Sequence, residues 1–156
     1  MMGRRRIFTL ALSVAVGLTL AMIFTLSLMP PSINSGNLEA AGDLIGTVVG
    51  EGSALGGFLR ENISNLAHLF EYFVLGVEVG LLFLIIAPAR KHYSFLLSAA
   101  LAVPFADETL QIFSGRHASI SDMWIDVVGI TAGFFTAVLL DFLKKRYTNR
   151  KNRKNG

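Results

Sequence analysis

The feature that most constrains this chain is an unbroken apolar run of 23 residues, Ile7 to Met29, without a single charge. A helix rises about 1.5 Å per residue, so this run is about 34 Å long and could cross a bilayer core of roughly 30 Å. A secretory signal peptide is the alternative, because Arg4, Arg5 and Arg6 precede the run. Signal peptides have apolar regions of only about 7–15 residues followed by a small-residue cleavage site, which TLSLMPPS poorly matches. We therefore expect an uncleaved membrane anchor.

Further apolar runs predict an all-α polytopic membrane protein, a bundle of four transmembrane helices. The spans are expected at about residues 7–29, 66–87, 94–113 and 123–143, which together make a membrane domain over 7–143. The third span is the weakest of these predictions, because its apolar part before Asp107 is short. It could instead be a half-length or re-entrant helix, which needs protein or a water-filled cavity around it.

The distribution of basic residues predicts the orientation of this bundle. Residues 1–6, the turn 88–93 and the tail 144–156 hold 12 of the 14 Lys and Arg residues, and only Arg60 and Arg116 lie on the other side. By the positive-inside rule, both termini are then cytoplasmic (N-in, C-in), and the loop 30–65 is external. Within this Gly-rich and Ser-rich loop, residues 44–63 could form a short helix at the membrane interface.

Composition excludes several classes of function. The basic tail 144–156 follows a membrane span directly, so attraction to anionic lipid headgroups explains it better than nucleic-acid binding. The sequence contains no cysteine, which excludes disulfides and thiolate chemistry. We therefore expect membrane lipids, and no nucleic acid, as partners.

Ionisable residues inside the predicted spans are the main functional signal, because a charge at mid-bilayer costs roughly 2.5–3.5 kcal/mol on insertion scales. His68, Glu71 and Tyr72 share one helix face at spacings of three and four residues. Asp107 and Gln111 share a face of the third span, and Glu108 is turned about 100° away from Asp107.

The fourth span carries a similar stripe, in which Asp122 and Asp126 precede Gly129 and Gly133 at spacings of three and four. The two glycines would let a neighbouring helix approach closely. The predicted topology brings all these polar groups to one depth, in the outer leaflet. Individually, Arg116 could merely neutralise Asp122, and His68 could be a packing hydrogen bonder. Together they predict one polar site formed by His68, Glu71, Tyr72, Asp107, Glu108, Gln111, Arg116, Asp122 and Asp126.

Such a site allows three uses. Crowded carboxylates and a histidine could perform acid–base chemistry on a lipid headgroup or hold a divalent cation, with His68, Glu71, Asp107, Glu108 and Asp126 as the candidate groups. Ligand contacts would fall to Tyr72, Gln111, Arg116 and Asp122, with the Arg116 guanidinium paired to a phosphate or carboxylate. A proton relay through Glu71, Glu78 and Asp107 could instead drive transport, and a pure binding module is the third possibility.

Two motifs in this set resemble a known family. HLFEYFVLG, from His68 to Gly76, and DETLQIFSGRHASISDMWIDVVG, from Asp107 to Gly129, resemble the VanZ-like family of small bacterial membrane proteins. The matching site positions are His68, Tyr72, Asp107, Glu108, Gln111, Arg116, Asp122 and Asp126. One departure is Asp126, where many members carry asparagine.

The resemblance implies a multi-pass protein of the bacterial plasma membrane with a part in the cell envelope and in low-level resistance to the glycopeptide teicoplanin. It implies no settled molecular activity. A lipid-linked envelope precursor or an amphiphilic glycopeptide is therefore the ligand we expect, to be recognised or modified, and proton-coupled transport of a lipid or small solute is the alternative.

Overall fold

The computed structural model describes residues 2–50, 52–86, 93–116 and 118–154, which form helices joined by short turns, with no strand among them. The helices are α1 (Met2–Ser27), α2 (Pro31–Val49), α3 (Ala54–Glu61), α4 (Ile63–Ile86), α5 (Tyr93–Phe113) and α6 (Ile120–Lys154). The all-α prediction is therefore confirmed.

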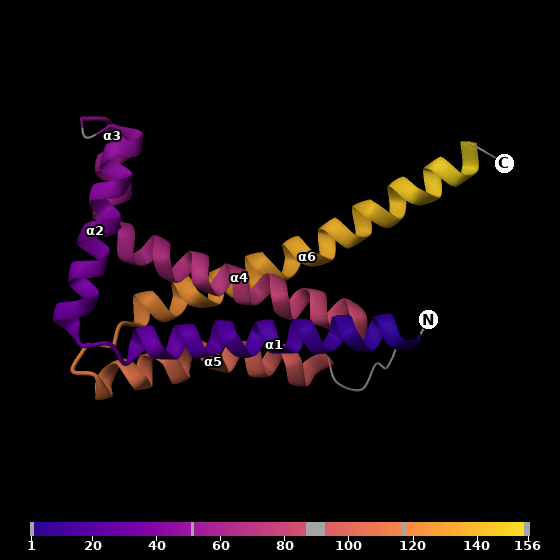
Figure 1. The fold of residues 1–156 in the computed structure, drawn as a ribbon, viewed down its shortest axis with the longest axis horizontal. Helices are drawn as coiled ribbons and strands as arrows, with labels where there is room; N and C mark the ends of the chain where they lie inside the picture. Colours follow the sequence, from indigo (N-terminus) through magenta and orange to yellow (C-terminus); the bar gives the residue numbers. More distant parts are fainter. Residues whose placement is uncertain (1, 51, 87–92, 117, 155–156) are drawn as a thin grey trace.

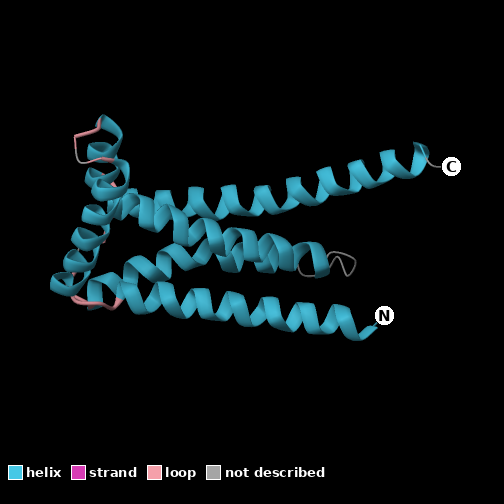
Figure 2. Ribbon diagram, turned by 45° about the horizontal axis from the view of Figure 1, so that its top comes forward, coloured by secondary structure: helices cyan, strands magenta, loops and turns pink. Residues whose placement is uncertain are grey.

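Four of these helices form a lengthwise bundle. Helices α1, α4, α5 and α6 run along the long axis of the molecule, and α2 and α3 stand across one end of it (Figure 1). The two termini lie at the opposite end, and the second view gives the same arrangement (Figure 2). The molecule thus has two different ends, which are here called the α2–α3 end and the terminal end.

Three helices, not four, are long and apolar enough to cross a membrane: Gly3–Ser27, Ile63–Ile86 and Ile120–Arg153. Of the four predicted spans, the third, at 94–113, is therefore not supported among the described residues. The helix itself forms as α5, and its 21 residues would be long enough. Several side chains in its first turn lie outside the described residues, and Asp107, Glu108 and Gln111 occupy its last two turns.

Glycines set how closely α4 and α6 pack. A Cβ added to Gly133 on α6 would overlap the carbonyl oxygen of Phe73, and one added to Gly76 on α4 would overlap the carbonyl oxygen of Ile130. A Cβ on Gly129 would lie 2.9 Å from the carbonyl oxygen of Leu69. The expected close approach at the small-residue stripe is therefore confirmed, and it is α4 that approaches.

The outer surface of the bundle is unusually apolar. The buried core is small and is formed by Ile23, Tyr72, Leu75, Val79, Ala100 and Ile130. Large hydrophobic residues are exposed along the outside of every bundle helix; Leu18 on α1, Phe70 on α4, Phe105 on α5 and Phe135 on α6 are examples. Soluble monomers rarely expose apolar surface on this scale, so these faces indicate a membrane environment.

Basic residues gather at the terminal end. Arg5 and Lys144 line one pocket there, together with residues of α4 and α6. Beyond Lys144, helix α6 continues to Lys154, and its side chains from Lys145 to Arg153 are exposed. The turn 88–93, which holds Arg90 and Lys91, lies almost entirely outside the described residues. Orientation across the membrane therefore stays a prediction from the sequence.

The segment between the first two spans is more helical than expected. It was predicted to be mainly a loop, but α2 and α3 occupy 27 of its 36 positions between 30 and 65. Helix α2 begins directly after Pro30, with Pro31 in its first turn, where the missing N–H of proline is harmless. In α3, the Ser53 hydroxyl caps the helix by accepting the N–H of Gly56.

Candidate functional site

The predicted polar residues meet at the α2–α3 end of the bundle. His68 lies in the second turn of α4, Asp107 in the last two turns of α5, and Asp126 in the second turn of α6. The close α4–α6 packing, set by Gly129 one turn beyond Asp126, brings His68 beside Asp126. Three helices that are distant in sequence thus contribute one side chain each.

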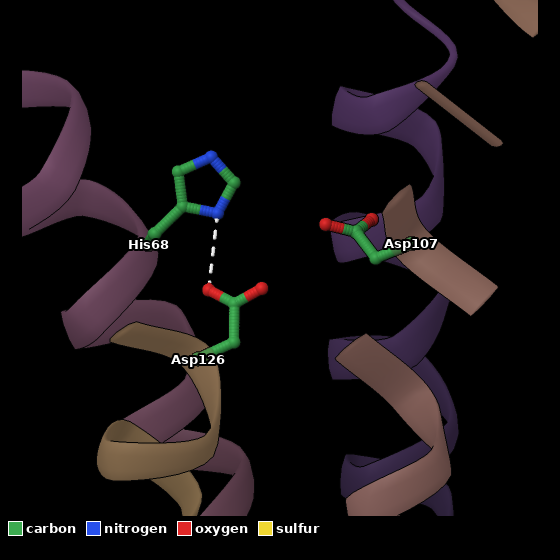
Figure 3. A group of neighbouring side chains, drawn as sticks. All are labelled: His68, Asp107 and Asp126. Carbon is green, nitrogen blue, oxygen red and sulfur yellow. Dashed lines mark ion pairs between the residues drawn. The ribbon is translucent and has the colours of Figure 1, made fainter. Parts of the chain in front are cut away.

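His68, Asp107 and Asp126 converge on one space. Each can offer one metal-ligating atom so that the three atoms all lie within 4.8 Å of one another. Figure 3 shows the His68 ring and the Asp126 carboxylate on one side of this space and the Asp107 carboxylate on the other, pointing toward them. The His68 Nδ1 and Asp126 Oδ1 atoms are 3.2 Å apart. These three residues are called the buried triad below.

The Asp107 carboxylate is held by two neighbours. Its Oδ1 contacts the Ser27 hydroxyl at the end of α1, and its Oδ2 accepts a hydrogen bond of 3.2 Å from the Gln111 amide. The Ser27 hydroxyl also lies 2.9 Å from the carbonyl oxygen of Ile23, so its single proton can serve only one of the two acceptors at a time. Asp107 is therefore fixed in place from both α1 and its own helix.

Unlike Asp107, Asp126 has no hydrogen bond to its carboxylate from the described residues. Its side chain is 0% exposed, and neither carboxylate oxygen makes a hydrogen bond to any described residue. The His68 Nδ1 atom is close enough for an ion pair but is not aligned for a hydrogen bond. Buried polar groups are normally hydrogen-bonded, so the His68 ring alone gives this carboxylate fewer partners than its burial requires.

A pocket of about 190 Å³ opens beside the buried triad. Glu71 and Arg116, both predicted site residues, line it with His68. Its remaining polar lining comes from Ser27, Asn34, Asn37 and Ser64, and its apolar lining from Leu26, Leu38 and Ala67. The pocket therefore offers a positive charge, a negative charge and an apolar wall at the mouth of the buried site.

The end of α5 places Arg116 at this pocket. Gly115 has a φ of 79°, the left-handed conformation that commonly terminates helices. The Arg116 N–H then donates to the carbonyl oxygen of Gln111 at 3.0 Å, which folds the chain back over the last turn. As a result, Arg116 follows directly on the last turn of α5 and lines the pocket.

Two of the predicted site residues instead shape the turn between α5 and α6. Glu108 accepts the backbone N–H of Ser119 at 2.6 Å, and Asp122 accepts the Ser119 hydroxyl at 3.1 Å. The same hydroxyl accepts the Asp122 N–H, so Ser119 is the N-cap of α6. Glu108 and Asp122 do not line the pocket, and their contacts point to a structural role.

Tyr72 lies deeper than expected for a ligand contact. It is fully buried in the core cluster, where it packs beside Leu75 and Ile130. Glu78, one or two turns further along α4, accepts a hydrogen bond of 3.1 Å from the Thr19 hydroxyl on α1. Tyr72 therefore belongs to the buried core and does not line the pocket. Glu78 has a partner of its own, Thr19, and does not line the pocket either.

Sequence reasoning missed Ser27, Asn34 and Asn37. Ser27 is a single hydroxyl at the end of an apolar run, and nothing in its neighbourhood distinguishes it from the other serines and threonines of that run. Asn34 and Asn37 belong to α2, which was expected to be loop. Their spacing of three, which places them on one helix face, could have indicated a polar wall.

The arrangement combines a closed inner part with an open outer part. The triad offers one imidazole and two carboxylates, a donor set that binds protons or a divalent cation. The pocket offers the Arg116 guanidinium, which suits a phosphate or carboxylate. Chemically, the site can hold an anionic headgroup at its mouth and a cation or proton beneath it.

Comparison with known proteins gives one match. The family model described as VanZ/LLP1 matches residues 8–141. No curated protein and no solved structure matches the chain. The match includes α4, α5 and the first turns of α6, where the two sequence motifs and the buried triad lie. Because it extends over far more than half of the 156 residues, the chain belongs to the VanZ/LLP1 family.

Proposed function

We propose that this VanZ-like membrane protein recognises or modifies a lipid-linked or amphiphilic ligand of the bacterial cell envelope, and that it acts in the response to glycopeptides such as teicoplanin. The observation that carries the proposal is the pocket at the α2–α3 end, where Arg116, Glu71 and His68 lie beside apolar side chains. A ligand with an anionic headgroup and an apolar tail matches this lining.

The proposed location is the outer leaflet of the plasma membrane. Arg5 and Lys144 lie at the terminal end, opposite the pocket, and most other basic residues of the sequence flank the same end of the spans. The positive-inside rule then puts the terminal end in the cytoplasm and the pocket outside. Lipid-linked envelope precursors and amphiphilic glycopeptides are both reachable from that side.

Binding of defined amphiphiles tests the ligand class. The protein is reconstituted in nanodiscs and titrated with a polyprenyl phosphate and, separately, with teicoplanin. Arg116→Gln should weaken binding of a recognised ligand by at least about tenfold, because a guanidinium–anion pair of roughly 1.5–3 kcal/mol is lost. Arg60→Gln is the matched control, since Arg60 is an exposed arginine near the same end that pairs with Asp43 at 2.6 Å and lies outside the pocket. Equal binding by both variants contradicts the proposal.

Cells give the second test. Expression of the protein should lower susceptibility to teicoplanin, and Arg116→Gln and Glu71→Gln should remove this effect while Arg60→Gln keeps it. A glycopeptide without a lipid tail serves as the comparison ligand. If the two pocket variants protect cells as well as the unaltered protein does, the pocket is not the site of the response.

Proton-coupled transport is the second candidate, and one observation favours it. Glu78 lies on α4 about two turns beyond Glu71, and its Oε2 atom is buried without a hydrogen bond among the described residues. Glu71, Asp107 and Glu78 would then form a relay along the span. Protein in liposomes with an imposed pH gradient should move a solute or lipid, and Asp107→Asn should abolish the movement. Turnover of a lipid without any gradient would favour an enzyme instead.

A further inference from the structure

The buried triad has a feature that a ligand pocket alone does not explain. Asp107 and Asp126, two carboxylates from different helices, face one imidazole in a space away from solvent, with exposed fractions of 1% and 0%. Arg116, the arginine that lines the neighbouring pocket, is not part of the triad. An isolated buried carboxylate is strongly unfavourable unless it is paired, protonated or bound to a metal.

We propose that His68, Asp107 and Asp126 form a binding site for one divalent transition-metal ion, with Zn²⁺ as the best fit. The three ligand atoms lie within 4.8 Å of one another, and the His68 Nδ1 and Asp126 Oδ1 atoms are 3.2 Å apart. Two ligands of a tetrahedral ion with bonds of about 2.0–2.1 Å are about 3.3 Å apart. The separation of the His68 and Asp126 atoms is thus compatible with two ligands of one ion.

The state of Asp126 is an independent observation that points to a missing partner. Both of its oxygens are buried and without a hydrogen bond among the described residues, and Figure 3 shows the carboxylate turned toward the space that the triad surrounds. His68 Nδ1 also lacks a hydrogen bond there. Atoms that ligate a cation need no hydrogen bond of their own, so a metal ion explains all three atoms at once.

The surroundings of Asp107 have the form of an outer coordination shell. Gln111 donates to one of its oxygens, and the Ser27 hydroxyl contacts the other. Metal-binding carboxylates are typically oriented by such hydrogen bonds. Asp107 and Asp126 differ for this reason: Asp107 is oriented by two hydrogen-bonding neighbours, and Asp126 has only the His68 ring at ion-pair distance.

The three side chains of the triad favour some metal ions over others. One imidazole with two carboxylates suits Zn²⁺, with Mn²⁺ and Fe²⁺ as weaker fits, whereas Mg²⁺ and Ca²⁺ prefer oxygen donors alone. Three protein ligands leave a fourth position of Zn²⁺ open. The pocket beside His68 could deliver a phosphate or carboxylate oxygen of the ligand to that position. In this role the inference rests on the proposed function, but binding of the metal itself does not need the ligand.

The test measures Zn²⁺ alone, with protein purified in detergent without a histidine tag. Equilibrium dialysis followed by elemental analysis should give one ion per chain, retained against an excess of Mg²⁺. Asp126→Asn and His68→Ala should each lower the affinity by at least about 100-fold, since loss of an outer-shell partner alone typically costs 10–100-fold. Glu78→Gln is the matched control, a carboxylate of the same span that contacts Thr19 instead.

A second measurement keeps all three proposed ligands and so does not depend on whether the Asp126 and His68 variants fold. The sequence contains two other histidines, His92 and His117, which lie outside the described residues. The double variant His92→Gln with His117→Gln leaves His68 as the only imidazole, and X-ray absorption at the zinc edge should then show one nitrogen ligand of imidazole type with oxygen ligands. No stoichiometric Zn²⁺ in the unaltered protein, or a bound ion without imidazole, overturns the proposal. Since no lipid is present, either result leaves the proposed function intact, and failed lipid binding leaves the metal site intact.

Discussion

At the scale of single residues, the site is divided between side chains that touch the pocket and side chains that hold others in place. His68, Asp107 and Asp126, which helical spacing and the predicted topology placed at one level of the bundle, converge in the structure. Helical spacing could not predict which way Glu108 turns. The fold of the α5–α6 turn decides that, since the Ser119 N–H lies 2.6 Å from the Glu108 carboxylate.

Ser27 provides a prediction about Asp107. Ser27→Ala removes the hydroxyl that contacts this buried carboxylate, so it should lower the free energy of unfolding by about 1 kcal/mol. It should also weaken Zn²⁺ binding by roughly 10–100-fold, as loss of an outer-shell partner does. Unfolding in mixed detergent micelles and metal titration measure the two effects.

Ser13→Ala is the control for this change, because Ser13 is an exposed serine on the same helix. It should change the free energy of unfolding by less than about 0.5 kcal/mol. Equal effects of the two substitutions would show that the Ser27 contact with Asp107 does not matter.

At the scale of helices, the α4–α6 pair determines the geometry of the site. The stripe of Gly129 and Gly133 was readable from the sequence, but its partner was not, because any of several helices could have packed there. The structure assigns Gly76 and Gly80 of α4 to the same interface, where a Cβ on Gly80 would lie 2.8 Å from the Cβ of Ala137. Close packing of two backbones is what puts His68 and Asp126 side by side.

Gly133→Leu tests this interface. A side chain at this position would overlap the backbone of Phe73, so α4 and α6 must separate, and the free energy of unfolding should fall by about 3 kcal/mol or more. Zn²⁺ binding should be lost with it, because His68 and Asp126 move apart. The unfolding midpoint in detergent and a metal titration measure both consequences.

Gly17→Leu on α1 is the matched substitution. No atom lies within 4 Å of a Cβ added there, so it should leave both stability and metal binding nearly unchanged. Comparable losses in the two variants would contradict the account of the α4–α6 interface.

Helix α5 shows where sequence reasoning about elements reaches its limit. Its position was predicted within one residue, at 94–113 against Tyr93–Phe113. Its assignment as a full span was not supported among the described residues, which leave out several side chains of its first turn. In the segment 30–65 only a short helix over 44–63 was expected, whereas the structure has helices at Pro31–Val49 and Ala54–Glu61. The glycines and serines of this segment favour loops locally, and the packing of α3 on α2, where Arg60 contacts Asp43, is a tertiary effect.

At the scale of the whole molecule, the two ends of the bundle differ in chemistry. The terminal end carries a cluster of basic residues that includes Arg5 and Lys144, and the α2–α3 end carries the pocket and the buried triad. The grouping of the basic residues and the level of the polar residues were both readable from the sequence, so the placement of the site at the end opposite Arg5 and Lys144 was predictable. The pocket wall from α2 was not, because it depends on how α2 folds across the bundle end.

Sidedness gives a direct prediction, since the sequence has no cysteine and single cysteines can be introduced cleanly. In intact cells, a membrane-impermeant maleimide should label Ser35→Cys on α2. It should label Asn149→Cys, near the end of α6, only after the membrane is permeabilised. Both positions are exposed in the fold.

The unaltered cysteine-free protein is the background for that experiment and should take up no label. The opposite pattern, with Asn149→Cys labelled in intact cells and Ser35→Cys protected, would place the pocket in the cytoplasm and exclude a ligand of the outer leaflet.

The central claim is that one site at the α2–α3 end receives an anionic amphiphile. A density map of the protein in nanodiscs made from its native lipid extract tests this most directly. The account predicts density for a headgroup in contact with Arg116, beside His68 and Glu71 and between α1, α2 and α4. A pocket that contains only water, with ordered headgroups bound elsewhere on the bundle, would contradict it.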